Sequence, residues 1–356
     1  ALLTKADRIG ISMESTSGSS GKPVKFYASV ANAKYMALRL FAQDLMEQRD
    51  FRENKVKIDF EADENSASSD KYFKVSTIKS GCGPLATVFE EGRISKINTL
   101  NTNKELLEEL GKHTPHTIIA RPNGMDSLLE MGGVELLVQL GVKRWIQMSE
   151  SRSEETDKSF RDAGIDISAN YSCEEVGPIA FECSKCPGHY HVAESNVVLE
   201  ADDSLTTEVD GEILSRVLLT HLHSYATPFI RYDVGDFAKL SNTCDCGHDG
   251  PTLSHIYGRA KRFICFPDGR YIPLQFRAKE IFDHVDCTEF QIHQKDLKTI
   301  VIHIGGRESL NENEVAALNE FIRNRTGADF DVVIRPVLEI DWYGNPKRLG
   351  FTSAVS

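Results

Sequence analysis

The chain has 356 residues and a formal net charge of -12, from 41 Lys and Arg against 53 Asp and Glu. This acidic balance argues against sequence-independent binding of nucleic acid, which depends on basic side chains that neutralise phosphates. No apolar run approaches the roughly 18–20 residues that a membrane span needs, so we expect a soluble, cytoplasmic protein. The length predicts two domains. Because the sequence does not open with Met, we expect it to begin inside a longer protein.

The first half of the chain predicts helices and strands in alternation. Residues 14–23 are small, polar and glycine-bearing and predict a loop, which a strand at 24–29 and a helix at 31–51 follow. Residues 52–75 are polar and predict no regular element. Beyond them, helical and strand-like patterns alternate through the segments 105–113, 117–122, 125–142 and 142–151. This rhythm favours an α/β domain with mixed or parallel sheets.

The pattern changes twice in the second half. After Asp166, turn-rich stretches separate strand-like segments and predict a smaller β-rich layer, with strands at 195–201, 211–222 and 237–241. Past Gly258, strands and helices are predicted within 263–273, 278–285, 298–305, 311–325 and 329–340. We therefore predict a large N-terminal α/β domain at 1–258 and a small α+β domain at 259–356, with the boundary near Gly258–Arg262.

One polar loop has the composition of a phosphate-binding loop. It consists of Thr16, Ser17, Gly18, Ser19, Ser20, Gly21 and Lys22. Its glycines let backbone N–H groups approach a ligand closely, and its hydroxyls and lysine can donate hydrogen bonds to phosphate oxygens. Only two residues separate the glycines and a proline follows the lysine, so this is not the loop of P-loop NTPases. A flexible Ser/Gly linker is the structural alternative.

Cysteine spacing predicts a metal site. The chain has eight cysteines, too few for a disulfide framework at this length, but two tight pairs of them have the grouping that usually holds a metal. With two nearby histidines, the candidate ligands are Cys183, Cys186, His189, His191, Cys244 and Cys246. A closed Cys/His set leaves no open coordination position, so we expect a structural metal, with buried free thiols as the alternative.

Five motifs follow one another in the order and spacing of a known superfamily. They are the loop TSGSSGKP at 16–23, NYSCEEVGP at 170–178, PFIRYDVGD at 228–236, Gly258-Arg259 and GNPKR at 344–348. Together they resemble the signatures of the adenylate-forming superfamily. Within it, NYSCEEVGPIAFEC, the PFIRYDVGD run and the later CDCG are similar to the phenylacetate–CoA ligase group. The resemblance extends over essentially the whole chain.

The resemblance implies an ATP-dependent, AMP-forming ligase. Such enzymes adenylate a carboxylic acid, often an aromatic one, release pyrophosphate and transfer the acyl group to the thiol of CoA. The cofactors implied are ATP and Mg²⁺, with CoA as co-substrate and a structural Zn²⁺; a homodimer is compatible with this reading. An amine, a carrier-protein thiol or a hydroxyl could replace CoA as acceptor. A non-catalytic nucleotide-binding homologue is the alternative of another class.

The resemblance also implies roles for residues of the nucleotide site. The loop Thr16–Lys22 would hold the β- and γ-phosphates, and Glu175 would bind Mg²⁺, a hard cation suited to carboxylate oxygens. Tyr171 would pack against adenine. Asp236 would accept hydrogen bonds from the ribose hydroxyls, and Arg259 would contact the ribose or a phosphate.

One residue near the C-terminus is implied to be catalytic. Lys347 would stabilise charge on the carboxylate and the α-phosphate during adenylation, and its neighbour Arg348 is a second candidate for that role. Lys261 is the expected hinge about which the small domain rotates as a lid. The sequence departs from the family pattern at Ser172, where glycine is usual, and at Pro346 before the lysine.

For the metal, the resemblance narrows the six candidates to a set of four. These are Cys183, His191, Cys244 and Cys246, which would bind a structural zinc ion. Cys186 is the alternate for His191.

Overall fold

A computed structural model describes the chain over most of its length. The described residues are 10–15, 24–59, 75–78, 92–99, 103–148, 152, 154–209, 211–258, 263–268, 270–273, 276, 278–342 and 350–355. Within these ranges, no helix is both long and apolar enough to cross a membrane.

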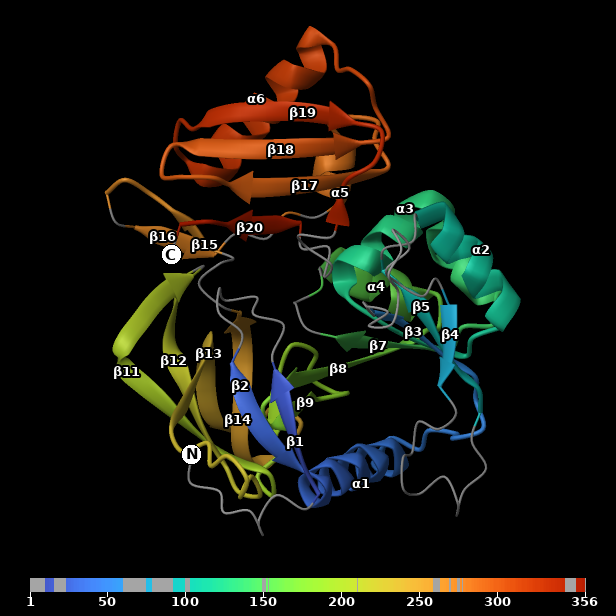
Figure 1. Cartoon of the computed structure of the whole chain (residues 1–356), viewed down its shortest axis with the longest axis vertical. Helices are drawn as coiled ribbons and strands as arrows, with labels where there is room; N and C mark the ends of the chain where they lie inside the picture. Colours follow the sequence, from blue (N-terminus) through green and yellow to red (C-terminus); the bar gives the residue numbers. More distant parts are fainter. Residues whose placement is uncertain are drawn as a thin grey trace.

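The α/β part is built on parallel strands covered by helices on one face (Figure 1). Its strands are β3 (Lys55–Asp59), β5 (Ile94–Asn98), β6 (Thr117–Ala120), β7 (Arg144–Met148) and β8 (Asp166–Cys173), with β4 (Val75–Ile78) antiparallel at the edge. The covering helices are α2 (Asn103–His113), α3 (Pro122–Gln139) and α4 (Glu154–Asp162). Side chains alternate across a strand, and those that face the helices, among them Val56, Ile118 and Trp145, form a fully buried core.

Antiparallel strands continue the same sheet. They are β9 (Gly177–Glu182), β10 (Tyr190–Val192), β11 (Val197–Val209), β12 (Glu212–His221), β13 (Tyr232–Thr243) and β14 (Asp249–Tyr257). Hydrogen bonding runs without a break in the order β11-β12-β13-β14-β10-β9-β8-β7-β6-β3-β5-β4, which makes one twelve-stranded sheet. The predicted β-rich layer is therefore joined to the α/β part through the pairing of β8 with β9.

The antiparallel end of this sheet is strongly curled. Strands β8 and β13 are separated in the sheet by β9, β10 and β14, which in a flat sheet would place them about 19 Å apart. The hydroxyl of Tyr171 on β8 nevertheless lies 2.7 Å from a carboxylate oxygen of Asp236 on β13. The inside of the curl is an apolar core that includes Val176, Val217 and Leu253. Curling thus brings residues from distant strands to one place.

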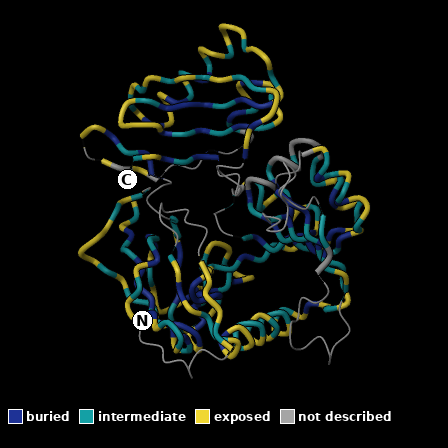
Figure 2. The backbone as a smooth tube through the Cα atoms, in the orientation of Figure 1, coloured by how far each residue is buried: buried dark blue, intermediate teal, exposed yellow. Residues whose placement is uncertain are grey.

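A hairpin and a helix near the start of the chain lie against this curled sheet. Strand β1 (Ile11–Ser15) pairs antiparallel with β2 (Lys25–Ser29), and Phe26 of β2 belongs to the apolar core of the curl. Helix α1 (Val30–Met46) follows directly, and the side chain of its N-cap Ser29 accepts a hydrogen bond from the Asn32 N–H. Figure 2 shows that α1 carries mostly intermediate and exposed residues.

The C-terminal part has its own sheet and core. Its strands are β17 (Glu289–Gln294), β18 (Thr299–Gly305), β19 (Asp331–Val337) and β20 (Phe351–Ser353), in the order β19-β18-β17-β20, with helices α5 (Ala278–Phe282) and α6 (Glu312–Thr326). A capping box between Asn311 and Glu314 begins α6, and Gly327 in a left-handed conformation ends it. Buried aliphatic and aromatic residues such as Ile292, Ile302 and Phe351 form the core.

A short hairpin lies between the two parts. It pairs β15 (Phe263–Cys265) with β16 (Tyr271–Pro273). Phe263 packs with Leu214 and Phe237 of the large sheet, whereas the Cys265 N–H donates to Gln294 of β17 at 2.9 Å. The hairpin therefore contacts both parts.

The predicted fold class is confirmed, and most predicted elements are present. Some elements lie where none was predicted. Residues 52–75 were expected to hold no element, yet β3 lies at Lys55–Asp59, where Val56 and Ile58 alternate with polar residues and are buried in a strand of only five residues. Other elements that no pattern predicted include α4, β5, β17 and β20; β17 reads as mixed polar and β20 is only three residues long.

Candidate functional site

The two acidic residues of the motif NYSCEEVGP lie in the turn between β8 and β9. Glu174 is exposed, whereas Glu175 is 3% exposed. Gly177 closes the turn with a φ of +74, and a Cβ at this position would lie 2.3 Å from Cε of Met36 on α1. Any other residue would be strained in this backbone conformation, and its Cβ would displace the flexible end of the Met36 side chain. The turn is thus fixed with one carboxylate outside and one inside.

The carboxylate of Glu175 has one satisfied oxygen and one unsatisfied oxygen. The Tyr232 hydroxyl donates a 2.8 Å hydrogen bond to Oε1, while Oε2 is buried and has no hydrogen-bond partner. Burial and the neighbouring Glu175 carboxylate also raise the pKa of the Cys173 thiol, which therefore stays protonated at neutral pH. A buried carboxylate oxygen without a partner is costly. A divalent cation would satisfy it, so these residues fit the predicted Mg²⁺.

A second polar pair lies nearby. Tyr171 donates from its hydroxyl to Oδ2 of Asp236 at 2.7 Å. Asp236 and Tyr232 are both on β13, and Tyr171 and Glu175 are on β8 and the turn that follows it. The structure therefore brings together three residues predicted for the nucleotide site, and it adds Tyr232, for which no role was predicted.

The predicted metal ligands form one cluster. The ligand atoms of Cys183, His191, Cys244 and Cys246 all lie within 4.8 Å of one another, and ligands held tetrahedrally at about 2.3 Å from zinc would be about 3.8 Å apart. His191 is on β10, which lies in the sheet between β9 and β14 and so between the two cysteine-bearing turns. The group is the set of four that the family resemblance implied.

Backbone N–H groups support the cysteine sulfurs. Although burial opposes it, the N–H groups of Lys185 and Cys186 and the neighbouring thiols lower the pKa of Cys183. The His248 N–H points at the sulfur of Cys246 at 3.4 Å. The turns need glycine at Gly188, where φ is +82, because few other residues adopt this conformation. Such N–H groups favour thiolates, the form that binds metal.

Cys186 lies beside this cluster. Burial raises the pKa of its thiol, and Cys244 and Cys183 also act on it. His189, the other sequence candidate, is half-buried and takes part in the turn through its backbone, since its carbonyl accepts from the Cys183 N–H at 2.7 Å. The sulfur of Cys186 is thus a fifth candidate ligand beside the four. His189 contributes to the turn through its backbone.

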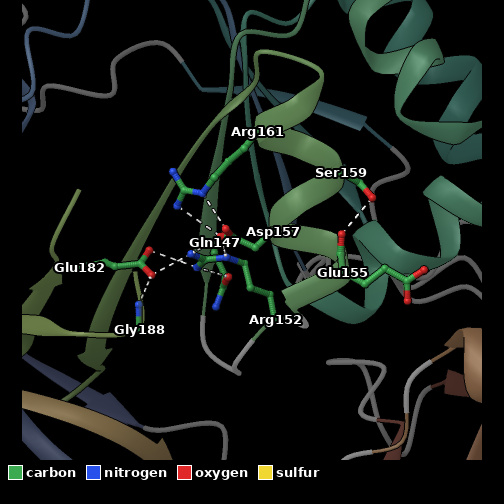
Figure 3. Close-up of polar contacts among 8 residues, drawn as sticks. All are labelled: Gln147, Arg152, Glu155, Asp157, Ser159, Arg161, Glu182 and Gly188. Carbon is green, nitrogen blue, oxygen red and sulfur yellow. Dashed lines mark hydrogen bonds and ion pairs between the residues drawn. The ribbon is translucent and has the colours of Figure 1, made fainter. Parts of the chain in front are cut away.

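A buried arginine connects the cysteine turn to the α/β part (Figure 3). The side chains of Arg152 and Glu182 are 7% and 4% exposed and form a bidentate pair, with one N···O distance of 2.7 Å. Arg152 also binds Asp157 of α4 at 2.6 Å. Glu182 in turn accepts from the Gly188 N–H at 2.9 Å. The cysteine turn is therefore tied by charge-assisted bonds to helix α4.

Solved structures with a similar fold are CoA ligases. A 2-hydroxyisobutyryl-CoA ligase, in a postadenylation state with 2-HIB-AMP, matches with a TM-score of 0.61 and 14% identity over 96% of this chain and 72% of that one. An anthranilate CoA ligase in complex with anthranoyl-AMP matches with a TM-score of 0.57 and 13% identity over 92% of this chain and 64% of that one. The chain adopts the fold of the adenylate-forming CoA ligases.

A third neighbour agrees with this fold. It is a benzoate CoA ligase from Burkholderia xenovorans, with a TM-score of 0.54 and 13% identity over 89% of this chain and 64% of that one. The chain therefore spans less than two thirds of the anthranilate and benzoate ligases. No protein-family model matches its sequence, and no curated protein matches it either.

Several residues predicted for the adenylate-forming site lie outside the described ranges. They are the loop Thr16, Ser17, Gly18, Ser19, Ser20, Gly21 and Lys22, together with Arg259, Lys261, Lys347 and Arg348. Strands β1 and β2 flank the loop, since β1 ends at Ser15 and β2 begins at Lys25. The roles of these residues remain predictions.

Two residues near Glu175 had no predicted role. Tyr232 belongs to the motif PFIRYDVGD, so its position inside a motif of the superfamily was the available signal. Asn196 carried no signal in the sequence. Its side chain contacts the turn that bears Glu175 only because the chain folds back on itself between β10 and β11.

Proposed function

We propose that the chain is an ATP-dependent, AMP-forming ligase that adenylates a carboxylic acid and passes the acyl group to CoA. The observation that carries this proposal is the buried Glu175 carboxylate, with Tyr232 on one oxygen and no partner on the other. The Tyr171–Asp236 pair beside it offers an aromatic ring and a carboxylate to a nucleoside. The 2-hydroxyisobutyryl-CoA ligase is also known in complex with 2-HIB-AMP and CoA, and the anthranilate CoA ligase in complex with anthranoyl-AMP, which supports the same chemistry here.

The reaction needs positioning and charge stabilisation rather than covalent help from the protein. A carboxylate oxygen of the acid would attack the α-phosphorus of ATP, forming the acyl–phosphate bond as the bond to pyrophosphate breaks. When bound, Mg²⁺ neutralises phosphate charge. Glu175 would hold it through Oε2, while Tyr232 keeps Oε1 in place. Lys347 would stabilise the charge that develops on the α-phosphate.

The second step requires access for a second nucleophile. We propose that residues 259–356 act as a lid that rotates about Lys261 and removes Lys347 from the site. The four-stranded sheet shares no strand with the twelve-stranded sheet, which is compatible with such a rotation. The CoA thiolate would then attack the acyl carbon, and AMP would leave. ATP and CoA are cytoplasmic metabolites, so the proposed reaction belongs in the cytoplasm.

The first test is pyrophosphate release with ATP, Mg²⁺ and a panel of carboxylic acids. Aromatic acids and short hydroxy acids come first, because the neighbours act on anthranilate, benzoate and 2-hydroxyisobutyrate. Hydroxylamine in the assay would trap the adenylate as a hydroxamate. We expect release with one class of acid, and that result would also identify the substrate class.

The same assay separates the competing functions. CoA, amines or a carrier protein added to preformed adenylate would identify the acceptor. Tight binding of ATP or AMP without pyrophosphate release from any acid would contradict the proposal. It would favour a nucleotide-binding protein without turnover.

We also propose that Cys183, His191, Cys244 and Cys246 bind one structural zinc ion. The close approach of the four ligand atoms and the N–H groups that point at the sulfurs support this. A closed set of this kind contributes to folding rather than to catalysis. Cys186 is the alternate for His191.

Metal analysis should find about one zinc per chain, and a strong chelator should lower the melting temperature. Cys244→Ser should lose both the zinc and that stability, whereas Cys265→Ser, a change outside the cluster, should keep both. Comparing the zinc affinities of His191→Ala and Cys186→Ser would identify the fourth ligand. Metal-free protein, purified without chelators and with unchanged stability, would refute the zinc site.

A further inference from the structure

A buried amide binds the turn that carries Glu175. Asn196 is fully buried, and its Nδ2 donates to the carbonyl oxygens of Val176 at 3.3 Å and Pro178 at 2.7 Å. Val176 directly follows Glu175 in the sequence, and Pro178 directly follows Gly177. The Asn196 side chain therefore binds the backbone on either side of Gly177, in addition to the pairing of Gly177 and Pro178 with β8.

A histidine fixes the amide itself. Because both Nδ2 hydrogens of Asn196 go to carbonyls, its Oδ1 must accept, and Nε2 of His221 lies 3.2 Å away. His221 is therefore the tautomer with hydrogen on Nε2, and its buried Nδ1 has no partner. Burial first, then His223 and Arg39, lower the pKa of His221 to about 4, so it stays neutral at neutral pH.

The segment that carries the amide is anchored to α1. The carbonyl of Ser195 accepts from the Tyr35 hydroxyl at 3.0 Å and lies 2.8 Å from Nε2 of His223. Arg39 contacts the Ser195 hydroxyl. The residue before Asn196 is thus bound to helix α1 and lies beside His223, while the Asn196 side chain reaches the turn.

We infer that Asn196, oriented by His221, is the positioning residue that sets Oε2 of Glu175 for the divalent cation of the ATP complex. The inference rests on the proposed function. Tyr232 holds the carboxylate from one side, and Asn196 holds the backbone that carries it from the other. Partners of this kind orient a ligand without touching the metal, and their loss typically weakens metal affinity by about 10- to 100-fold.

The test uses Asn196→Asp, which keeps the size of the side chain but has no N–H to donate. The free Mg²⁺ concentration that gives half-maximal pyrophosphate release at saturating ATP should rise by about 10- to 100-fold. The KM for the acid should change little. The EPR spectrum of Mn²⁺ in the ternary complex with ATP should move toward that of Glu175→Gln.

His221 provides a second pair of variants if Asn196→Asp does not fold. His221→Gln keeps a donor for Oδ1 of Asn196 and should retain the low Mg²⁺ requirement, whereas His221→Leu should raise it. Gln294→Glu is the matched control, since it alters a buried amide that donates to the Cys265 carbonyl at 2.7 Å in the C-terminal part. It should lower thermal stability without changing the Mg²⁺ requirement.

The outcomes separate this inference from the proposed function. If Asn196→Asp keeps the Mg²⁺ requirement and Mn²⁺ spectrum of the wild type while Glu175→Gln changes both, Asn196 does not position Glu175. If Glu175→Gln itself leaves the Mn²⁺ spectrum unchanged, Glu175 is not the ligand, and the inference fails together with the proposed Mg²⁺ site.

Discussion

Glu175→Gln should lower Mg²⁺-dependent pyrophosphate release by about 100-fold, since a direct ligand matters at least as much as the partners that orient it. Glutamine can still accept from Tyr232, so the turn should stay folded. It would place an uncharged amide where a buried carboxylate oxygen now has no partner. The measurement is the rate of release as a function of free Mg²⁺, together with the melting temperature.

The neighbouring glutamate gives a matched control. Glu174 is exposed on the same turn, so Glu174→Gln should leave the Mg²⁺ dependence unchanged. A loss of activity in Glu174→Gln with normal activity in Glu175→Gln would move the ligand by one residue. It would also leave the buried position of Glu175 without a functional reason.

Lys347→Ala should reduce adenylation by about 100- to 1000-fold, the effect of removing one preorganised donor from a developing charge. ATP binding, measured by calorimetry, should remain nearly intact, because the residue is proposed to act when charge develops on the α-phosphate. Since the lid is proposed to carry Lys347 away before the second step, acyl-adenylate supplied directly should still react with CoA.

Arg348→Ala is the control for this prediction, because it removes the adjacent cation. We expect it to adenylate at close to the normal rate. Unchanged adenylation in Lys347→Ala would remove Lys347 from the mechanism, and a defect in Arg348→Ala alone would assign the role to Arg348.

Local pattern was sufficient where an element has a strong period. The helices α1 and α6 were predicted because their apolar residues recur at helical spacing, and α6 also has the Asn311–Glu314 capping box. Strand β3 was missed because the alternation of its buried Val56 and Ile58 with polar residues covers only five residues beside a long polar stretch. Its position depends on pairing with β5 and β6, which no local pattern records.

The spacing of cysteines in the sequence predicts a metal site but not all of its ligands. The pairs Cys183/Cys186 and Cys244/Cys246 could be recognised in the sequence, but six donors remained for four positions. The fold selects among them by geometry, because β10 carries His191 between the two turns, and the group of close ligand atoms includes His191 and not His189. Cys186 lies close enough to Cys183 and Cys244 to be an alternative metal ligand.

The sequence by itself determined the fold class, the order of the motifs and the candidate ligands, because these depend on residue type and local spacing. Only the tertiary structure decided that Glu175 rather than Glu174 is buried, that Tyr232 and Asp236 meet the turn and strand of β8, and that Asn196 supports them. The physical reason is the curling of the sheet. Curling brings together strands that are neighbours neither in sequence nor in hydrogen bonding. The curled form is stabilised by burial of an apolar core to which many strands contribute.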